Sequence, residues 1–255
     1  MTKHTHVLNV KSNNRPGYIF MKYYRPIRPF KAISFDLDDT LYDNHSVIQK
    51  AGDAIIEHLN RTYPQLATLT QKQWSLYRDI EAAEFPEIKH DVSLWRIKTL
   101  TRIMVIYGIP EFKAIDYAQQ AFTEFIKLRS DFVVPQESLQ LLAKLAETLP
   151  VIAITNGNVD EFQIQLHDKF KFILKAGNGF KSKPEADLFI EAARRLDIEV
   201  GDILHVGDHL ISDVYGAQNN GAQAVWFNPN KQSLSGAMLL PTVEISRLDQ
   251  LYKLL

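Results

Sequence analysis

Residues 31–40 read Lys-Ala-Ile-Ser-Phe-Asp-Leu-Asp-Asp-Thr, an apolar run that ends in acidic residues. The apolar part is typical of a buried strand, and Asp36 and Asp38 follow at its end. Two carboxylates at the end of a buried strand are costly unless a cation offsets their charge. Magnesium binds through one or two carboxylates together with water and phosphate oxygens. The stretch therefore predicts a Mg²⁺ site and a phosphorylated substrate.

The composition limits the classes of protein that this chain can be. Its 255 residues are enough for one large α/β domain with a smaller companion. A formal net charge of -1 gives no overall attraction to nucleic acid or to an acidic membrane surface, so we expect neither as a partner. Cysteine is absent, which excludes disulfides, thiolate nucleophiles and zinc–thiolate sites. No apolar stretch is long enough to span a bilayer, and we expect a soluble, cytoplasmic monomer.

The spacing of apolar residues differs between two parts of the chain. From about residue 45 to residue 131, apolar residues return every three or four positions, and breaks near Tyr63-Pro64, Phe85-Pro86 and Gly108 suggest about four helices in a small bundle. After Pro135, helices alternate with short apolar strands, which favours a parallel sheet covered on both faces. The expected strands are 31–35, 150–155, 202–206 and 223–227, and the expected helices are 136–148, 185–196 and 211–220.

The first strand precedes the helical block, and this order predicts an inserted domain. We expect an α/β core with a doubly wound, mostly parallel sheet, made of residues 21–45 and 132–255, and a helical bundle over residues 46–131. Residues 1–20 are polar and have no sustained periodicity. We expect them to be a disordered N-terminal extension.

Polar residues follow the predicted strands and should converge, because ligands bind beyond the carboxyl ends of an open parallel sheet. These residues are Asp36 and Asp38 after the first strand, Thr155 and Asn156 after the second, and Asp208 and Asp213 after the third. Lys183 lies in the loop before a helix whose first position we expect to be Pro184. Carboxylates, a hydroxyl and an amine at one edge suit phosphoryl transfer, which depends on positioning and on neutralising phosphoryl charge.

Taken together, these stretches resemble the four motifs of the haloacid dehalogenase-like phosphohydrolases, in the order of that family. The matching stretches are Asp36-Leu37-Asp38-Asp39-Thr40, Thr155-Asn156-Gly157, Lys183-Pro184 and Gly207-Asp208-(x4)-Asp213. The resemblance covers essentially all of the chain after residue 21. It implies a Rossmann-like core and identifies the inserted helices with a helical C1-type cap.

Carried over to this sequence, the resemblance implies a mechanism through a covalent intermediate. Asp36 would attack phosphorus and become an aspartyl phosphate, and Asp38 would act as general acid and then general base. Asp36, Asp208 and the backbone carbonyl of Asp38 would hold Mg²⁺. Thr155, Asn156 and Lys183 would bind the phosphate oxygens, and Asp213 would support the metal site or orient Lys183.

The acid at position 38 favours phosphate ester hydrolysis, because dehalogenase members of the family lack an acid there and transport ATPases carry lysine. Further stretches, including Tyr23-Tyr24-Arg25-Pro26 and His90-Asp91-Val92, resemble a bacterial group of phosphatases that is associated with a ribitylaminouracil phosphate in flavin biosynthesis. The implied partner is thus a small phosphorylated metabolite. Two alternatives stay open: a phosphotransferase or mutase of the same fold, and a binding module without activity.

Several of these residues also have plain structural interpretations. Thr155 could cap a helix that starts after its strand, and Asp39 is expected to be a capping residue. His205 lies inside an apolar strand and is expected to be a packed core histidine. His209, next to the predicted metal ligand Asp208, is expected to face solvent.

Overall fold

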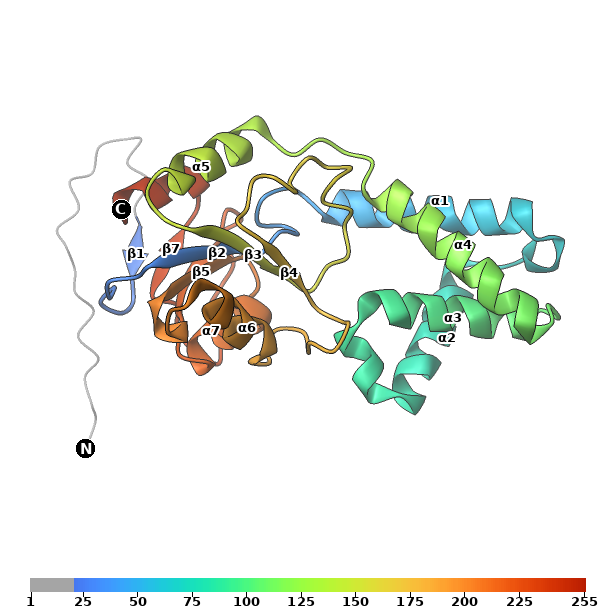
Figure 1. The fold of residues 1–255 in the computed structure, drawn as a ribbon. Helices are drawn as coiled ribbons and strands as arrows, with labels where there is room; N and C mark the ends of the chain where they lie inside the picture. The colour runs from blue at the N-terminus through green and yellow to red at the C-terminus, as the bar shows by residue number, and fades with distance from the viewer. Residues whose placement is uncertain (1–20) are drawn as a thin grey trace.

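Within residues 21–255, the part of the chain that this computed structural model describes, seven strands form one sheet (Figure 1). The strands are β1 (Lys22–Tyr23), β2 (Ala32–Phe35), β3 (Val151–Thr155), β4 (Ile173–Lys175), β5 (Ile203–Gly207), β6 (Gln223–Phe227) and β7 (Val243–Ile245). Their order is β1-β7-β6-β5-β2-β3-β4, and every neighbouring pair is parallel except β1 and β7. This confirms the predicted mostly parallel sheet. The expected extension over residues 1–20 lies outside the described residues.

The order in which the chain adds strands to the sheet changes direction between β2 and β5. The chain places β3 and β4 on one side of β2, then returns to the other side for β5, β6 and β7. In the register of the central pair Phe35 lies opposite Val206, and the amide of Asp36 donates a 2.8 Å hydrogen bond to the carbonyl of Val206. The two chain segments that leave β2 and β5 therefore emerge side by side, at the place where open sheets bind ligands.

Helices cover both faces of the sheet, as the alternating pattern predicts. Helix α5 (Gln136–Ala146) buries Leu141 and Leu145 in one core cluster, together with Ile33 and Phe35 of β2. Helices α6 (Asp187–Leu196) and α7 (Gly216–Asn219) contribute to a second cluster with alternate side chains of β3. Short 3₁₀ segments lie at Pro64–Leu66, Pro86–His90, Val200–Asp202 and Leu248–Lys253.

Two boundary predictions near the site are wrong. The helix expected over 211–220 is instead a π-helical segment, Leu210–Tyr215, followed by the short α7. Such π segments are frequent at functional sites, and this one carries Asp213. Helix α6 begins at Asp187 rather than at Pro184. The backbone amide of Lys183 donates a hydrogen bond to the side chain of Asn156, and the carbonyl of Lys183 accepts one from the same side chain. These bonds hold the backbone before Pro184 outside a helix.

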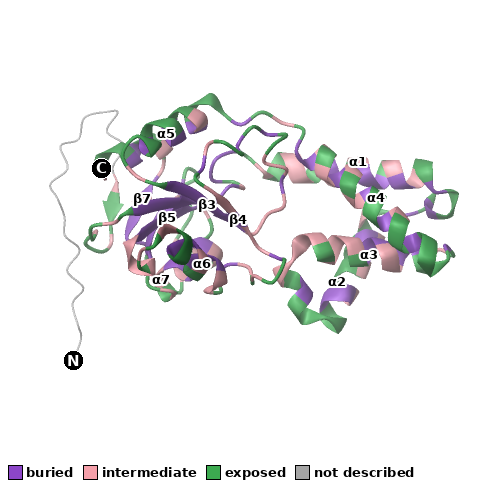
Figure 2. Cartoon of the chain, viewed as in Figure 1, coloured by how far each residue is buried: buried purple, intermediate pink, exposed green. Residues whose placement is uncertain are grey.

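The segment between β2 and α5 holds four helices, α1 (His45–Thr62), α2 (Gln71–Glu84), α3 (Val92–Ile106) and α4 (Glu111–Arg129). They form their own apolar cluster, in which Leu59, Leu100, Ile103 and Phe125 are almost fully buried. Figure 2 shows buried positions on these helices as well as in the sheet. We call these four helices, together with the segments that connect them, the cap. The exact boundaries proposed for it, 46 and 131, stay a prediction. Across residues 21–255 no helix combines the length and the apolar character that a membrane crossing requires.

Candidate active site

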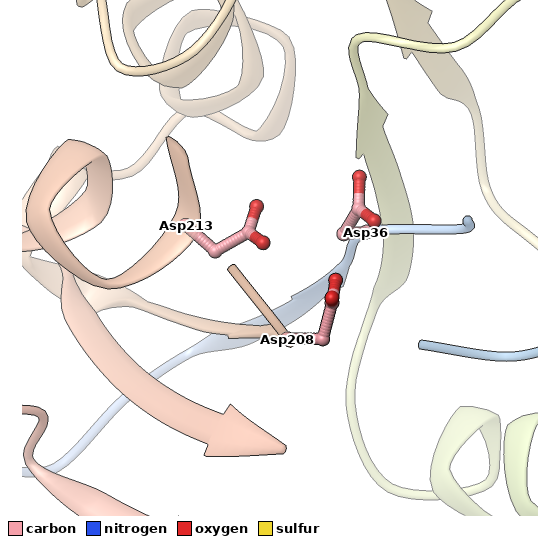
Figure 3. A group of neighbouring side chains, drawn as sticks. All are labelled: Asp36, Asp208 and Asp213. Carbon is pink, nitrogen blue, oxygen red and sulfur yellow. The ribbon is translucent and has the colours of Figure 1, made fainter. Parts of the chain in front are cut away.

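Three carboxylates meet at the point where the sheet changes direction (Figure 3). Asp36 follows β2, Asp208 follows β5, and Asp213 comes from the π-helical segment. One oxygen of each lies within 4.8 Å of the others, with Asp36 and Asp213 buried and Asp208 partly exposed. Parallel strands end at the same edge, so residues far apart in sequence converge here.

Lys183 is a buried cation inside this cluster. Its Nζ donates to Oδ1 of Asp36, to Oδ1 of Asp213 and to the carbonyl of Ile154, each at 2.7 Å, and the residue is 3% exposed. Burial opposes its charge, but the carboxylates of Asp213 and Asp36 outweigh burial and raise the pKa of Lys183. The side chain is therefore held as an ammonium at the centre of the site.

The site carries more negative charge than Lys183 offsets. Burial raises the pKa of Asp36 well above its ordinary value, although Lys183 opposes the shift, and Asp213 adds to it. Burial, with the charges of Asp213 and Asp39, raises the pKa of Asp208 to about 7. A divalent cation would relieve this repulsion, and an all-oxygen donor set suits Mg²⁺. Asp36, Asp208 and the backbone carbonyl of Asp38 are the groups that would hold it.

Asp213 uses its oxygens within the protein. Oδ1 accepts from Lys183 and lies 3.2 Å from Nε2 of His205, and Oδ2 accepts from the amide of His209 at 2.9 Å. Burial opposes the charge of Asp213, but Lys183 and His205 lower its pKa. His205 is fully buried, as predicted, and its Nδ1 also lies 2.8 Å from the hydroxyl of Ser34. Of the two roles expected for Asp213, these contacts favour orienting Lys183.

The residues after β3 differ in what they offer a phosphate. No α-helix follows β3 directly, so the helix-capping interpretation of Thr155 is wrong; its Oγ1 instead accepts a 3.0 Å hydrogen bond from the amide of Gly157. The side-chain amide of Asn156 makes two 2.8 Å hydrogen bonds with the backbone of Lys183. The side chain of Asn156 therefore positions the Lys183 loop. Since both polar atoms of this side chain are used, the backbone amide is the group of Asn156 that would bind a phosphate.

Asp38 has two partners that sequence reasoning missed. The hydroxyl of Tyr42 donates to Oδ1 of Asp38 at 2.7 Å, and Nη2 of Arg129 donates to Oδ2 at 2.6 Å. Arg129 is 91 positions away from Asp38 and ends the last cap helix, so no local pattern could connect them. Tyr42 is only four residues away, but one tyrosine after a motif carries little signal.

One pocket is lined by all seven predicted site residues. They are Asp36, Asp38, Thr155, Asn156, Lys183, Asp208 and Asp213, and the neighbours Asp39, Gly157, His209 and Ser212 complete the lining. His209 is exposed, as predicted, and its Nδ1 accepts from the amides of Ile211 and Ser212. Asp39 accepts from the amides of Asn44 and His45, which fits its expected capping role.

The cap touches the core beside this pocket. Nδ1 of His90 lies 2.9 Å from the hydroxyl of Ser182, and Lys181 forms an ion pair with Glu87 at 3.2 Å. The carboxylate of Asp91 lies so close to Gly177 that a Cβ there would come within 2.6 Å of it. These contacts sit immediately before Lys183, so the cap reaches the loop that carries the central cation.

Replacing Gly157 with alanine is expected to disable the site without unfolding the protein. A Cβ at this position would lie 2.4 Å from Oδ2 of Asp38 and 3.1 Å from Arg129, so the Asp38 carboxylate would have to move. A misplacement of about 1 Å at a reacting group costs about 10²-fold in rate. Phosphatase assays and melting temperatures would check this. Gly201→Ala is the control, because its Cβ would meet nothing closer than 3.6 Å; equal losses in both variants would contradict the prediction.

Magnesium affinity is expected to fall as the pH drops below 7. The raised pKa of Asp208, about 7, means that binding the ion displaces a proton from this carboxyl at lower pH. Between pH 7.5 and pH 6 the apparent affinity should weaken about tenfold. Calorimetric titration of the protein with MgCl₂ at both pH values measures it, and an unchanged dissociation constant would contradict the assignment.

Comparison with known proteins shows what the chain is similar to. The sequence profile of the haloacid dehalogenase-like hydrolase family matches residues 30–221. The chain is 39% identical to 5-amino-6-(5-phospho-D-ribitylamino)uracil phosphatase YigB of Escherichia coli, over 92% of this chain and 100% of that protein. It is 27% identical to glyceraldehyde 3-phosphate phosphatase of Pyrococcus furiosus, over 80% and 83% of the two chains.

A solved structure is similar over almost the same length. The crystal structure of a 2-haloacid dehalogenase from Pseudomonas syringae pv. tomato superimposes with a TM-score of 0.83 at 33% identity, and the match covers 88% of this chain and 97% of that one. The family profile spans most of the chain, and the Escherichia coli phosphatase matches 92% of the chain over the full length of that protein. The chain therefore belongs to the haloacid dehalogenase-like hydrolase family, and its enzyme class is phosphoric monoester hydrolase.

Proposed function

We propose that the protein is a Mg²⁺-dependent phosphatase that hydrolyses monoesters of small metabolites through an aspartyl phosphate on Asp36. The observation that carries the proposal is the position of the Asp36 carboxylate. Its Oδ1 is held at 2.7 Å by Lys183, while the same carboxyl group belongs to the acidic cluster with Asp208. A carboxylate fixed in this way, beside a cation and a predicted metal site, is placed to attack a phosphorus atom.

The residues divide the two half-reactions between them. An oxygen of Asp36 forms the new P–O bond as the ester P–O bond breaks, and Asp38 donates a proton to the departing alkoxide. Asp38 then takes a proton from the water that attacks phosphorus, which releases inorganic phosphate and restores Asp36. Bound Mg²⁺ would neutralise part of the phosphate charge. Lys183 supplies a second positive charge for the transferring oxygens.

Thr155 and the loop after it complete the phosphate site. Thr155 and Asn156 line the pocket, and they follow β3, which lies on the other side of β2 from the strand that precedes Asp208. Donors fixed in place cost no reorganisation when charge develops on the phosphoryl oxygens. The buried contact between Lys183 and Asp213 keeps the ammonium in position throughout the cycle.

The proposed substrate is a ribitylaminouracil phosphate. Its support is the 39% identity with the Escherichia coli phosphatase named for that compound, which extends over the full length of that protein. The cap, whose contacts reach the Lys183 loop, would cover the non-phosphate part of the molecule and keep bulk water from the site.

A release assay tests both levels of the proposal. The purified protein is incubated with 5-amino-6-(5-phospho-D-ribitylamino)uracil or with glyceraldehyde 3-phosphate, with Mg²⁺ or with EDTA, and free phosphate is measured. We expect release that requires Mg²⁺ and a higher kcat/KM for the ribitylaminouracil compound. Absence of release from every monoester, or transfer of the phosphoryl group to an added sugar in place of water, would refute the hydrolase. A preference for glyceraldehyde 3-phosphate would refute only the substrate.

A further inference from the structure

Arg129 is a buried arginine with all three types of guanidinium nitrogen in use. It is 2% exposed, and its Nη2, Nη1 and Nε donate to Asp38 at 2.6 Å, Asn44 at 2.9 Å and Asn158 at 2.9 Å. An arginine fork holds such a set in fixed geometry, which a lysine cannot do. Asp38 and Asn44 lie in the segment between β2 and α1, and Asn158 lies in the loop after β3, so Arg129 connects two separate parts of the core to the end of α4.

These partners connect both ends of the cap to the site. Arg129 is the last residue of α4, where the chain leaves the cap, and Asn44 directly precedes α1, where the chain enters it. Asn158 belongs to the loop after β3 and donates at 3.2 Å to the hydroxyl of Ser93, near the start of α3. A movement of the cap relative to the core therefore has to move the guanidinium that holds Asp38.

The carboxylate of Asp38 has little freedom of its own. Arg129 holds Oδ2, Tyr42 holds Oδ1, and the backbone of Gly157 lies against the same carboxylate. Proton transfer requires a carboxyl oxygen within hydrogen-bond reach of the leaving oxygen, so this orientation governs its efficiency. A pair that only stabilised the fold would not need to be built on the carboxylate that the reaction uses as its general acid.

We propose that Arg129 is a positioning residue that couples the placement of the cap to proton transfer by Asp38. The inference rests on the proposed function, because it gives Asp38 the role of general acid. It goes further because it assigns the orientation of that acid to the contact between Arg129 and Asn44, which lie where the chain leaves and enters the cap. Arg129 itself does not take part in bond making.

The test compares two esters that need a general acid to different degrees. An alkyl phosphate such as glycerol 2-phosphate releases a strongly basic alkoxide, whereas p-nitrophenyl phosphate releases a weakly basic phenolate that departs without protonation. The ratio of kcat/KM for the two esters reports the proton transfer, since kcat/KM covers the steps up to leaving-group departure. Asp38→Asn sets the reference and should lower the alkyl rate by at least about 10²-fold more than the aryl rate.

Arg129→Lys should reproduce this selectivity in weaker form, with a loss of about tenfold or more for the alkyl ester and less than about threefold for the aryl ester. Adding Arg129→Lys to Asp38→Asn should cost nothing further on the alkyl ester, because both changes remove the same step. Asn44→Ala is a milder second variant that loosens Arg129 without leaving a buried charge unpaired. It should shift the ratio in the same direction.

Arg102→Lys is the matched control, because Arg102 also bonds two acidic side chains in the cap, Glu81 and Glu84, but does not touch Asp38. It should leave the ratio unchanged. Equal losses on both esters in Arg129→Lys and Asn44→Ala, or an additive double variant, would overturn the inference while the phosphatase stands. A wild-type protein that hydrolyses neither ester, or an Asp38→Asn variant that does not distinguish them, would instead locate the failure in the proposed function.

Discussion

Asp36→Asn is expected to lower phosphatase kcat by about 10⁴-fold or more, because removing a covalent nucleophile removes the step that the rest of the site supports. The amide keeps the size of the side chain and can still accept a hydrogen bond from Lys183, which in the wild type lies 2.7 Å from Oδ1. The fold should therefore survive. Steady-state release of phosphate, with the melting temperature measured in parallel, checks both statements.

Two further measurements distinguish a covalent nucleophile at Asp36 from a carboxylate that only binds the metal. Asp38→Asn should slow hydrolysis of the intermediate, whereas an aryl ester can still form it without a general acid. Intact-protein mass spectrometry after mixing this variant with p-nitrophenyl phosphate should therefore show one added phosphoryl group. The double variant with Asp36→Asn should show none. Asp208→Asn should lose Mg²⁺ affinity and recover activity as the Mg²⁺ concentration rises, whereas Asp36→Asn should not recover. Labelling that persists without the Asp36 carboxylate would disprove the nucleophile.

Lys183→Met is expected to have the largest effect on stability, a loss of about 3–5 kcal/mol in the free energy of unfolding at pH 7 without Mg²⁺. The buried ammonium is bonded to Asp36 and Asp213, and its removal leaves two carboxylates buried near each other with no cation. Activity should disappear as well, because the phosphoryl oxygens lose a positive charge. Urea unfolding of both proteins measures the difference.

The pH dependence of this loss follows from Asp213. Lys183 lowers the pKa of Asp213, so in the wild type this pair contributes stability that is present above the ordinary carboxyl pKa and is lost as the pH falls. The difference in the free energy of unfolding between wild type and Lys183→Met should therefore be largest near neutral pH and become smaller towards pH 4. Lys31→Met, which breaks the exposed pair with Asp202, is the control. Its free energy of unfolding should differ little from that of the wild type at every pH, because solvent screens such a pair. A stability difference that grows as the pH falls would contradict the role given to the Lys183–Asp213 pair.

The main architecture was predictable because each of its signals is local. Apolar runs that end in polar residues located β2, β3, β5 and β6 to within about one residue, and breaks at proline and glycine separated the four cap helices. The strands β1, β4 and β7 were missed, since each is only two or three residues long. Such short edge strands are defined by their partners rather than by their own pattern.

The same distinction applies to the site. Asp36, Asp38, Thr155, Lys183, Asp208 and Asp213 were found because each follows a recognisable strand or begins a motif. Asn156 was found as well, but the use of its side chain was not, because that side chain bonds to the backbone of a residue 27 positions away. The hydrogen-bond chain through His205 also depends on a strand pairing, the one that places Ser34 opposite His205.

The sequence by itself determined the class of fold, the acidic residues at the strand ends and the kind of chemistry they favour, since strand periodicity and residue type are properties of short stretches. Only the tertiary structure decided which groups control those residues. Lys183 became a buried cation between Asp36 and Asp213, and Asp38 came under the control of Arg129 at the exit of the cap. Burial and the meeting of distant segments set these electrostatic relations, and neither is encoded in any single stretch of the chain.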